Sequence, residues 1–472
     1  MADSKLLKFI DRAQAYPSKR TADERTHDFL EIARPYIVAK AEEQAARCSQ
    51  CGVPFCQVHC PLHNNIPDWL KLTAEGRLEE AYELSAATST MPEICGRICP
   101  QDRLCEGNCV IEKDFGSVTI GSVEKFITDT AWENGWVKPV RIVADRSAQS
   151  VGIIGAGPAG LTTAELLRTK GYVVHVYDRY DRAGGLLTYG IPGFKLEKPV
   201  VMRRVERLRD AGIVFHHNFE VGRDASMAEL RARHDAILVA TGVYKPRSVD
   251  VPGADSAGVV EALDYLTASN RQGFGDNVAT GYDAEGKHVV VIGGGDTAMD
   301  CVRTAVRQGA ASVKCLYRRD RANMPGSLRE VNHAEEEGVE FVWLAAPASI
   351  EAGVVKAQRM RLGQAGADGR RAPEIEPGAD FTAPADLVIK ALGFDPEDLP
   401  GLFGAPDLSV TRWGTLRIDG KTMMTSLPGV FGAGDIVRGA SLVVWAVRDG
   451  RDVTANMHHY LRARIAGVAK AA

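Results

Sequence analysis

Eight of the ten cysteines in this chain lie between residues 48 and 109, in two sets of four. The sets read C-x2-C-x4-C-x3-C-P and C-x3-C-P-x4-C-x3-C, and their members are Cys48, Cys51, Cys56 and Cys60, then Cys95, Cys99, Cys105 and Cys109. Eight thiols in so short a stretch can ligate two four-cysteine metal centres. No other feature constrains the fold of this region as much, because the backbone has to bring these thiols together.

Iron–sulfur cubanes are the favoured occupants, because the C-x3-C-P ending of the first set is typical of ferredoxin ligation. Zinc is the main alternative, since four-cysteine zinc sites are common and His59 and His63 stand close by. The second set speaks against zinc, because its cysteines pair at a spacing of four and share one face of a helical turn. Unligated thiols remain a third possibility. Cys301 and Cys315 lie in apolar surroundings and are interpreted as buried small hydrophobes.

The composition is that of an ordinary globular protein, with 45% hydrophobic and 25% charged residues in 472. A chain of this length predicts about two or three domains. The net charge of −4 gives no sign of a nucleic-acid surface or a membrane anchor. No apolar run is long enough for a signal or a membrane span, so we expect a cytoplasmic protein. In that reducing setting, clustered cysteines indicate metal or redox chemistry rather than disulfides.

Residues 1–146 are expected to form a helical domain. The stretches 5–13, 28–47 and 67–85 space their apolar positions by three and four, as helices do. Beyond Ser147 the pattern changes to short β-branched runs followed by glycine-rich turns, which predicts parallel α/β units.

The fold class is therefore α/β, with a helical iron–sulfur domain followed by two Rossmann-like dinucleotide-binding domains, the second inserted in the first. The expected bounds are 1–146 for the helical domain, 147–270 with 395–472 for the first dinucleotide domain, and 271–394 for the second. Within the second, residues 351–380 predict a hairpin with a mobile loop and carry no assigned chemistry.

A glycine-rich turn follows the apolar strand at 151–154 and opens a helix. Its residues are Gly155, Gly157, Pro158, Ala159 and Gly160. The first glycine permits a tight turn, the second lets the backbone approach a pyrophosphate, and the third lets the helix pack on the strand. A second strand ends at Asp178, where a carboxylate can hydrogen-bond a ribose hydroxyl. Together these elements predict a dinucleotide site.

Two distant segments identify FAD as the dinucleotide of this first unit. ILVATG ends in Thr241-Gly242 and GVFGAGD ends in Gly434-Asp435, and both are typical of flavoproteins with two dinucleotide domains. We expect Asp435 to hold the ribityl–phosphate region, and the helix that begins near Ser441 to direct its dipole at the flavin. The alternative is that Asp435 only caps this helix.

The segment AGGLLTYGIPGFKL, residues 183–196, is expected to run along the flavin. Gly184, Gly185 and Leu186 would let the backbone approach the cofactor, although a plain structural turn explains the two glycines equally well.

A second glycine-rich turn follows the strand at 288–292. Its residues are Gly293, Gly294, Gly295, Asp296, Thr297 and Ala298. The next strand ends not in an acid but in Arg318 and Arg319, with Arg321 nearby, and guanidinium groups there suit a 2′-phosphate. NADPH is therefore favoured over NADH. The alternative is that these arginines form a solvated surface run.

The chain resembles the small (β) subunits of bacterial NADPH-dependent glutamate synthases. The resemblance is carried by QAARCSQCGVPFCQVHCPLHNNIPDW, PEICGRICPQDRLCEGNC, GAGPAGL, AGGLLTYGIPGFKL, GGGDTAMDC, YRRDRANMPG and GAGDIVRGASLVVWAVRDGR, between residues 44 and 451. The amino-terminal half of dihydropyrimidine dehydrogenase and subunits of NAD(P)H:ferredoxin-type oxidoreductases are similar to it as well.

The resemblance implies two [4Fe–4S] clusters whose ligands cross between the two cysteine sets. One cluster would be held by Cys48, Cys51, Cys56 and Cys109, and the other by Cys60, Cys95, Cys99 and Cys105. In some relatives another ligand replaces Cys95, so the resemblance defines that position least.

The resemblance also implies a large (α) partner subunit with a glutaminase site, FMN and a further cluster, in a hetero-oligomer. The chain would then be an electron-input subunit that oxidises NADPH at FAD and passes single electrons to the clusters. No acid–base or nucleophilic side chain is demanded by that chemistry, so no catalytic residue is nominated. Two alternatives stay open: an NADPH:ferredoxin-type or sulfide-linked oxidoreductase subunit with another acceptor, and a non-catalytic scaffold stabilised by metal and nucleotide.

Overall fold

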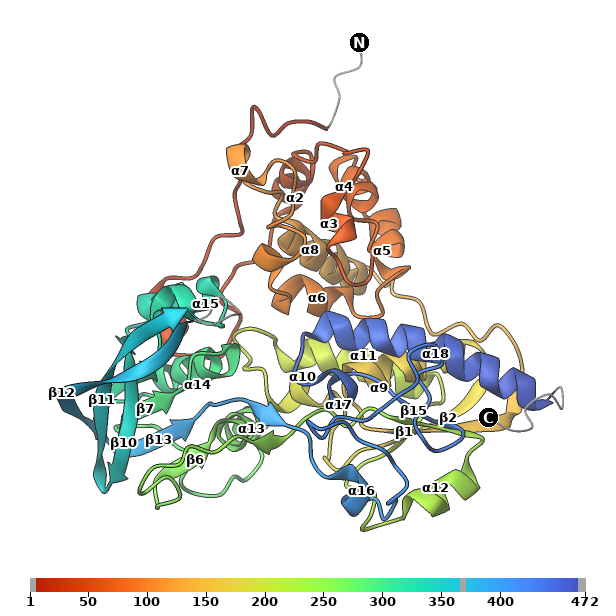
Figure 1. Cartoon of the computed structure of the whole chain (residues 1–472). Helices are drawn as coiled ribbons and strands as arrows, with labels where there is room; N and C mark the ends of the chain where they lie inside the picture. The colour runs from red at the N-terminus through yellow and green to blue at the C-terminus, as the bar shows by residue number, and fades with distance from the viewer. Residues whose placement is uncertain (1–5, 366–370, 466–472) are drawn as a thin grey trace.

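The computed structural model describes residues 6–365 and 371–465 (Figure 1). Its amino-terminal part consists of short helices around the buried indole of Trp69, which donates to Asn64 Oδ1 at 3.0 Å. The elements are α1 Ala22–Thr26, α2 Val38–Ala45, α3 Phe55–Val58, α4 Ile66–Ala74, α5 Leu78–Ala86, α6 Pro92–Ile98, η1 Gln101–Arg103, α7 Glu112–Phe115 and α8 Ile120–Glu133. The expected helical domain is confirmed by this arrangement.

Two of the expected helices differ from the structure. Residues 67–85 form two helices rather than one, because Gly76 adopts φ +77° between α4 and α5 and ends the first. Within the predicted helix at 5–13, the described residues from Leu6 onward form turns instead. Their backbone is held by the buried Arg47, whose Nε donates to the carbonyl of Arg12 at 2.9 Å. Tertiary hydrogen bonds thus override the local helical pattern.

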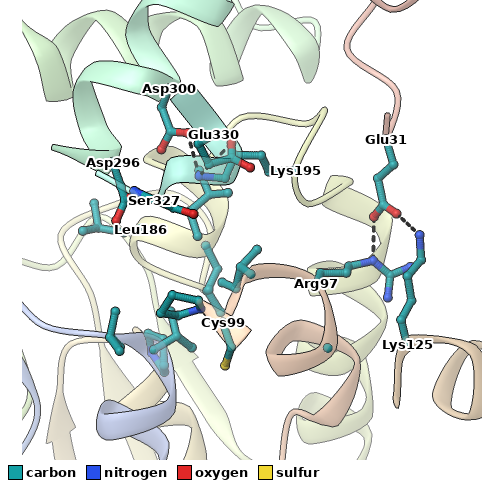
Figure 2. A pocket seen from close by; sticks show the side chains of 18 of the residues that line it. Glu31, Arg97, Cys99, Lys125, Leu186, Lys195, Asp296, Asp300, Ser327 and Glu330 are labelled. Carbon is teal, nitrogen blue, oxygen red and sulfur yellow. Dashed lines mark hydrogen bonds and ion pairs between the residues drawn. The ribbon is translucent and has the colours of Figure 1, made fainter. Parts of the chain in front are cut away.

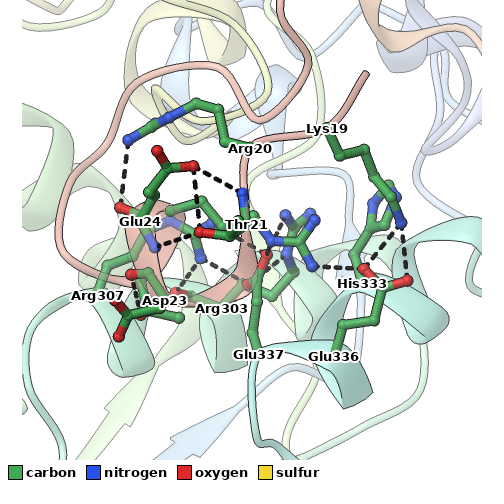
Figure 3. A network of polar contacts seen from close by, with 12 residues as sticks. Lys19, Arg20, Thr21, Asp23, Glu24, Arg303, Arg307, His333, Glu336 and Glu337 are labelled. Carbon is green, nitrogen blue, oxygen red and sulfur yellow. Dashed lines mark hydrogen bonds and ion pairs between the residues drawn. The ribbon is translucent and has the colours of Figure 1, made fainter. Parts of the chain in front are cut away.

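Residues 15–37, which we call the strap, are irregular apart from α1, although 28–37 had been expected to be helical. Pro35 lies in this segment and cannot donate a helical hydrogen bond. Figure 3 shows the strap against the second dinucleotide unit. There the buried Arg25 contacts Glu337 at 3.1 Å, and Glu337 also pairs with Arg303 at 2.9 Å. The strap is therefore docked through buried charges rather than through helix packing.

A five-stranded parallel sheet forms the first dinucleotide unit, in the order β15-β4-β1-β2-β3. Its strands are β1 Arg146–Ile154, β2 Tyr172–Tyr177, β3 Val214–His216, β4 Ala236–Val239 and β15 Val430–Gly432. The helices of this unit are α9 Pro158–Thr169, α10 Leu186–Tyr189, α11 Lys198–Asp210, α12 Met227–Arg233, α16 Leu399–Leu402, α17 Asp435–Arg438 and α18 Val443–Ile465. The long helix α18 lies against α9, between the sheet and the amino-terminal part (Figure 1).

A second parallel sheet, in the order β6-β13-β7-β8-β9, is inserted between β4 and β15 of the first. Its strands are β6 Val259–Glu261, β7 His288–Ile292, β8 Ser312–Tyr317, β9 Glu340–Trp343 and β13 Leu387–Lys390, and its helices are α13 Ala262–Gly273, α14 Asp296–Arg307, η2 Arg321–Asn323 and α15 Leu328–Glu336. The chain crosses between the units where β5 Lys245–Pro246 pairs with β14 Phe394–Asp395. The predicted boundary between residues 270 and 271 is therefore too late, because β6 and α13 already belong to the second unit.

The hairpin expected over 351–380 is present as the antiparallel pair β11 Gly353–Ala365 and β12 Arg371–Ala385, with β10 Ala345–Glu351 beside β11. The loop expected at its tip, 366–370, lies outside the described residues. Within the described part of the chain, no helix is long and apolar enough to cross a membrane.

The amino-terminal part shares a core with the first dinucleotide unit. Leu62, Ile94 and Cys95 pack in one apolar cluster with the strands β1 and β2. A buried ion pair crosses the same interface, where Arg204 on α11 donates to both carboxylate oxygens of Glu93 at 2.9 and 3.0 Å. The buried apolar cluster and the buried ion pair together fix the cysteine-rich part against the dinucleotide unit.

Candidate functional site

A cavity of about 780 Å³ lies where the three parts of the molecule meet. Most of the residues that we assigned to FAD line it: Gly155, Gly157, Pro158, Ala159, Asp178, Gly185, Leu186, Thr241, Gly242, Gly434, Asp435 and Ser441. From the second unit, Asp296 and Thr297 line it, and from the amino-terminal part Cys99 does. The fold therefore brings the first glycine turn, the second glycine turn and one cysteine to a single space.

The first glycine turn has the geometry expected of a pyrophosphate site. Gly155 adopts φ +105°, and a side chain there would collide with the carbonyl oxygen of Ala240. A side chain on Gly160, which does not line the cavity, would collide with the carbonyl of Gly155. A Cβ on Gly157 would have no described atom within 4 Å, so the backbone there faces open space. The turn can thus receive a ligand at the amino end of α9.

Asp178 fastens this turn from the end of β2. Its carboxylate accepts from the backbone amide of Ala156 at 2.6 Å and from that of Tyr180 at 2.9 Å. Burial raises the pKa of Asp178, while the two amides oppose the rise. Beside this turn in the cavity wall, Thr241 Oγ1 is buried without a hydrogen-bond partner in the described part of the chain. An unpaired hydroxyl in a cavity wall is the kind of group that a bound polar ligand satisfies.

Asp435 is the first residue of α17, and Ser441 precedes α18, which begins two residues later than expected, at Val443. Burial raises the pKa of Asp435 to about 6, and the backbone amide of Ser441 opposes this by donating to the carboxylate. Asp435 therefore does bind the start of the α18 segment, as the capping alternative held. It also lines the cavity, so both interpretations have support.

The two glycines at 184–185 are required by the backbone itself. Both have positive φ, and a Cβ on Gly185 would lie 2.9 Å from the Cα of Gly157. The amide of Gly184 donates to the carbonyl of Ala156 at 2.8 Å. The structural-turn interpretation therefore accounts for both glycines, while Gly185 and Leu186 also face the cavity.

The second glycine turn packs tightly at its first two residues and is open at its third. Side chains on Gly293 or Gly294 would collide with Ala391 or with the Tyr317 ring, whereas a Cβ on Gly295 meets no described atom within 4 Å. Ala298 is fully buried in the core of this unit. Asp296 accepts from the amide of Ser327 at 2.8 Å. The open face at Gly295, at the amino end of α14, fits a second dinucleotide.

The three arginines after β8 do not line the cavity and differ in what they contact. Arg321 donates to Glu335 Oε1 at 2.5 Å and to Asn332 Oδ1 at 2.6 Å. Arg319 is half-buried and its Nε has no hydrogen-bond partner in the described ranges. Arg318 is exposed. The exposure of Arg318 agrees with the alternative of a solvated surface run, but it also leaves that guanidinium accessible to a ligand. Arg321 is already bonded to Glu335 and Asn332.

Four of the eight cysteines share a small pocket. Cys60, Cys95, Cys99 and Cys105 line a space of about 30 Å³, and Cys99 also lines the large cavity. Burial raises the pKa of Cys60 to about 11. A thiol of that kind loses its proton when a metal supplies positive charge, so the donor set fits a metal centre.

The other four cysteines are neighbours of one another. Burial raises the pKa of Cys56 to about 12, and the nearby thiols of Cys109, Cys48 and Cys51 add to the rise because a second negative charge would be repelled. Ser49 Oγ lies 3.0 Å from the sulfur of Cys51, and Gln50 donates to the sulfur of Cys48 at 3.3 Å. Hydrogen bonds to sulfur are among the contacts that tune iron–sulfur centres. In residues 6–365 and 371–465, no three Cys, His, Asp or Glu side chains converge closely enough for a single ion. Cys301 and Cys315 are fully buried in the second unit, as expected.

Sequence reasoning missed a cluster of charged side chains in the wall of the large cavity (Figure 2). Lys195 Nζ donates to Asp300 Oδ1 at 2.8 Å and lies 3.7 Å from Glu330 Oε2. Asp300 stands one helical turn after Asp296 in α14, which is the signal that could have found it. Nearby, Glu31 of the strap pairs with Arg97 at 2.5 Å and with Lys125.

Two family models match the chain, one over the cysteine-rich part and one over the two dinucleotide units. The model described as dihydropyrimidine dehydrogenase domain II, 4Fe-4S cluster, matches residues 25–136. The model described as pyridine nucleotide-disulphide oxidoreductase matches residues 149–450. The cysteine-rich part is therefore a 4Fe-4S domain, and the zinc alternative no longer stands.

Curated relatives match over nearly the whole chain. The glutamate synthase [NADPH] small chain of Azospirillum brasilense is 65% identical, covering 98% of this chain and 98% of the relative. The protein of the same name from Escherichia coli K12 is 46% identical, covering 97% and 99%. Among solved structures, Mycobacterium tuberculosis FprA in complex with NADPH has a TM-score of 0.56 at 20% identity, over 69% of this chain and 87% of FprA, and shares the fold.

Proposed function

Because the chain belongs to the family of glutamate synthase [NADPH] small chains, and is therefore an NADPH-dependent flavin oxidoreductase, we propose that it supplies electrons from NADPH to a large partner subunit that makes L-glutamate from L-glutamine and 2-oxoglutarate. The non-catalytic scaffold alternative no longer stands. The observation that carries the proposal is the position of Cys99, which lines both the dinucleotide cavity and the cysteine pocket. A cluster bound there would lie next to the dinucleotide that supplies its electrons.

We assign FAD to the first unit and NADPH to the second. Bound FAD would take two electrons from NADPH and release them singly to iron–sulfur centres. Gly157 and the amino end of α9 would receive the pyrophosphate of FAD, with Thr241 as a further hydrogen-bonding group. Gly295 and the amino end of α14 would receive the pyrophosphate of NADPH. Arg318 and Arg319 would bind its 2′-phosphate, whereas Arg321 is used to hold η2 to α15.

We assign two [4Fe–4S] clusters to the amino-terminal domain, with ligands exchanged between the two cysteine sets. Support comes from the shared pocket of Cys60, Cys95, Cys99 and Cys105 and from the mutual proximity of Cys48, Cys51, Cys56 and Cys109. The Cys99 centre would stand next to the flavin cavity, and the other would stand farther along the path to the partner.

The partner we propose is a large (α) subunit that carries FMN and its own cluster, joined to this chain in a cytoplasmic hetero-oligomer. The alternative acceptor, a ferredoxin or sulfide-linked system, has less support, because the relative at 65% identity is named for glutamate synthase over the full length of both chains.

Reconstitution with the large subunit tests the proposal. The purified chain should reduce a dye with NADPH, and the pair should form glutamate from glutamine, 2-oxoglutarate and NADPH. Cys99→Ser should keep NADPH-dependent bleaching of the flavin but lose glutamate formation and one set of cluster signals in electron paramagnetic resonance. Cys301→Ser serves as the control, because Cys301 is buried in the second unit with its thiol directed at the carbonyl of Ala262. Dye reduction without glutamate formation by the wild-type pair would contradict the assigned acceptor.

A further inference from the structure

Oxidation of NADPH yields NADP⁺, two electrons and one proton. Iron–sulfur centres held by Cys99 and its neighbours would carry the electrons away, but they would not carry the proton. The proton is set free in a cavity that lies between three parts of the protein. A side chain that accepts it is therefore needed, and none was assigned from the sequence.

Asp300 is placed for this task. It lies on α14, one turn after the second glycine turn, and its side chain lines the cavity although the residue is only 7% exposed. Lys195 reaches across from the first unit and donates to Oδ1 at 2.8 Å. Figure 2 shows Asp300, Lys195 and Glu330 gathered on the side of the cavity opposite Cys99. Electrons and proton would thus leave the cavity in different directions.

We propose, on the basis of the proposed function, that Asp300 accepts the proton that remains when the two electrons of NADPH leave, and that α15 carries the route from there to solvent. In this step the carboxylate of Asp300 would gain the proton and the two electrons would pass to the iron–sulfur centres, with NADP⁺ as the oxidised product. Lys195 acts as a positioning residue, because its ammonium group holds the carboxylate at the cavity wall.

The electrostatic surroundings suit a reversible acceptor. Burial raises the pKa of Asp300 to about 6, and the adjacent Lys195 limits the rise. The titratable and charged groups facing Asp300 are Lys195 and Lys198 from the first unit, Asp296, Cys301 and Arg303 from α14, and Glu330 from α15. Burial lowers the pKa of Lys198 to about 7. At neutral pH the group is therefore ionised and still basic enough to take a proton, as a general base near the working pH should be.

The exit follows one face of α15. Glu330, His333 and Glu336 recur every three residues, and all three line the cavity. His333 Nδ1 lies 3.5 Å from Glu330 Oε1, and burial lowers the pKa of His333, so its ring is neutral at pH 7. The side chain of Glu336 is 42% exposed. Against the effect of burial, Lys195 and Arg303 hold the pKa of Glu330 well below its usual range, and Lys19 and Arg25 lower that of Glu336. The neutral His333 ring is therefore the group of this row that can take up a proton between the cavity and solvent.

The test compares wild-type, Asp300→Asn, Asp300→Glu and Asp283→Asn holoenzymes; Asp283 is exposed and outside the cavity. Wild-type flavin must bleach with NADPH, and failure there would refute the proposed function rather than the role of Asp300. Turnover with a one-electron dye should fall about 100-fold in Asp300→Asn, with unchanged NADPH affinity and a matching delay of proton release reported by an indicator dye. The wild-type rate should decline below about pH 6, where Asp300 is already protonated, and this decline should vanish in Asp300→Asn.

Infrared difference spectra give a readout that does not depend on turnover. On acidification through pH 6, the wild type should gain a protonated-carboxyl component that shifts in Asp300→Glu and is absent from Asp300→Asn. Asp435, whose pKa is also raised to about 6, contributes equally to every variant and cancels when their spectra are subtracted. A wild-type rate and pH profile in Asp300→Asn, or a carboxyl band of full wild-type intensity in that variant, would overturn the proposal. If Asp300→Asn does not fold, Asp300→Glu decides, since it must retain both the band and the low-pH decline.

Discussion

Replacing Arg318 by alanine is expected to remove most of the preference for NADPH over NADH, whereas replacing Arg321 should leave that preference in place. Arg318 is exposed at the end of β8 and forms no ion pair within the described ranges. Arg321, only three residues later, already donates to Glu335 and Asn332 at 2.5 and 2.6 Å. Of these two residues, only Arg318 therefore has its guanidinium donors free for a 2′-phosphate.

The expected magnitude follows from the bond that is lost. A hydrogen bond to a charged group contributes about 1.5–3 kcal/mol, and about 1.4 kcal/mol corresponds to a factor of ten. Arg318→Ala should therefore lower kcat/KM for NADPH by roughly 10- to 100-fold and leave NADH unchanged. Arg321→Ala should change the ratio of the two nucleotides less than about threefold, because it removes an exposed contact worth about 0–1 kcal/mol of stability.

The assay is dye reduction with each nucleotide at one fixed ionic strength, because screening by salt alters charge–phosphate attraction. Arg319→Ala is a useful third variant, since the Nε of Arg319 lacks a hydrogen-bond partner in the residues described. Equal losses with NADPH and NADH in Arg318→Ala, or a larger loss of selectivity in Arg321→Ala, would refute the assignment.

Three further outcomes are expected. Arg204→Ala leaves the Glu93 carboxylate buried without its partner, so calorimetry should show the transition of the cysteine-rich domain destabilised by about 3–5 kcal/mol, and Glu93→Leu combined with Arg204→Met should restore it. Arg451 on α18 donates to the carbonyls of Leu62 and Thr88, near the Cys60 turn. Arg451→Ala should make one cluster potential more negative in a redox titration, because a positive charge near the cluster is lost. Arg464→Ala, at the end of the same helix, should leave that potential unchanged. Burial lowers the pKa of His234 to about 4 from its ordinary 6.5. Between these two pH values the unfolded chain binds more protons than the folded chain, so the free energy of unfolding should fall by up to about 3 kcal/mol as the pH drops from 6.5 to 4. Thermal unfolding at several pH values should show this decline, and a less steep one in His234→Asn.

The parallel strands and glycine turns were predictable from the sequence, because the physics that forms them is local. Apolar β-branched runs such as 288–292 favour strands because their side chains suit a buried pleated surface, and the positive φ of Gly155 favours a residue without a side chain. The helices of the amino-terminal part were predicted less well. Turns replace the described part of the 5–13 helix because Arg47 holds that backbone from a distance.

The residues of the cavity also fall into two groups, those predictable from a local sequence pattern and those brought together by tertiary contacts. Asp178 and Asp435 stand at fixed places after their strands, so pattern alone found them. Lys195 belongs to the first unit, whereas Asp300 and Glu330 lie on neighbouring helices of the second, so Lys195 reaches them only when the two units are side by side. The spacing from Asp296 could have pointed to Asp300, but nothing in the sequence pairs it with Lys195. The three arginines after β8 looked equivalent in the sequence, and only their contacts separate Arg321 from Arg318.

The eight cysteines, their spacing and the two glycine turns determined by themselves that this chain is built for metal and dinucleotide chemistry, because those groups place demands on residue types at short range. The tertiary structure decided which four cysteines share a pocket, that Cys99 borders the dinucleotide cavity, and that a strap of buried charges ties the amino-terminal domain to the second unit. These depend on contacts between residues as far apart as Arg25 and Glu337, where packing and charge neutralisation, rather than local backbone preference, set the outcome.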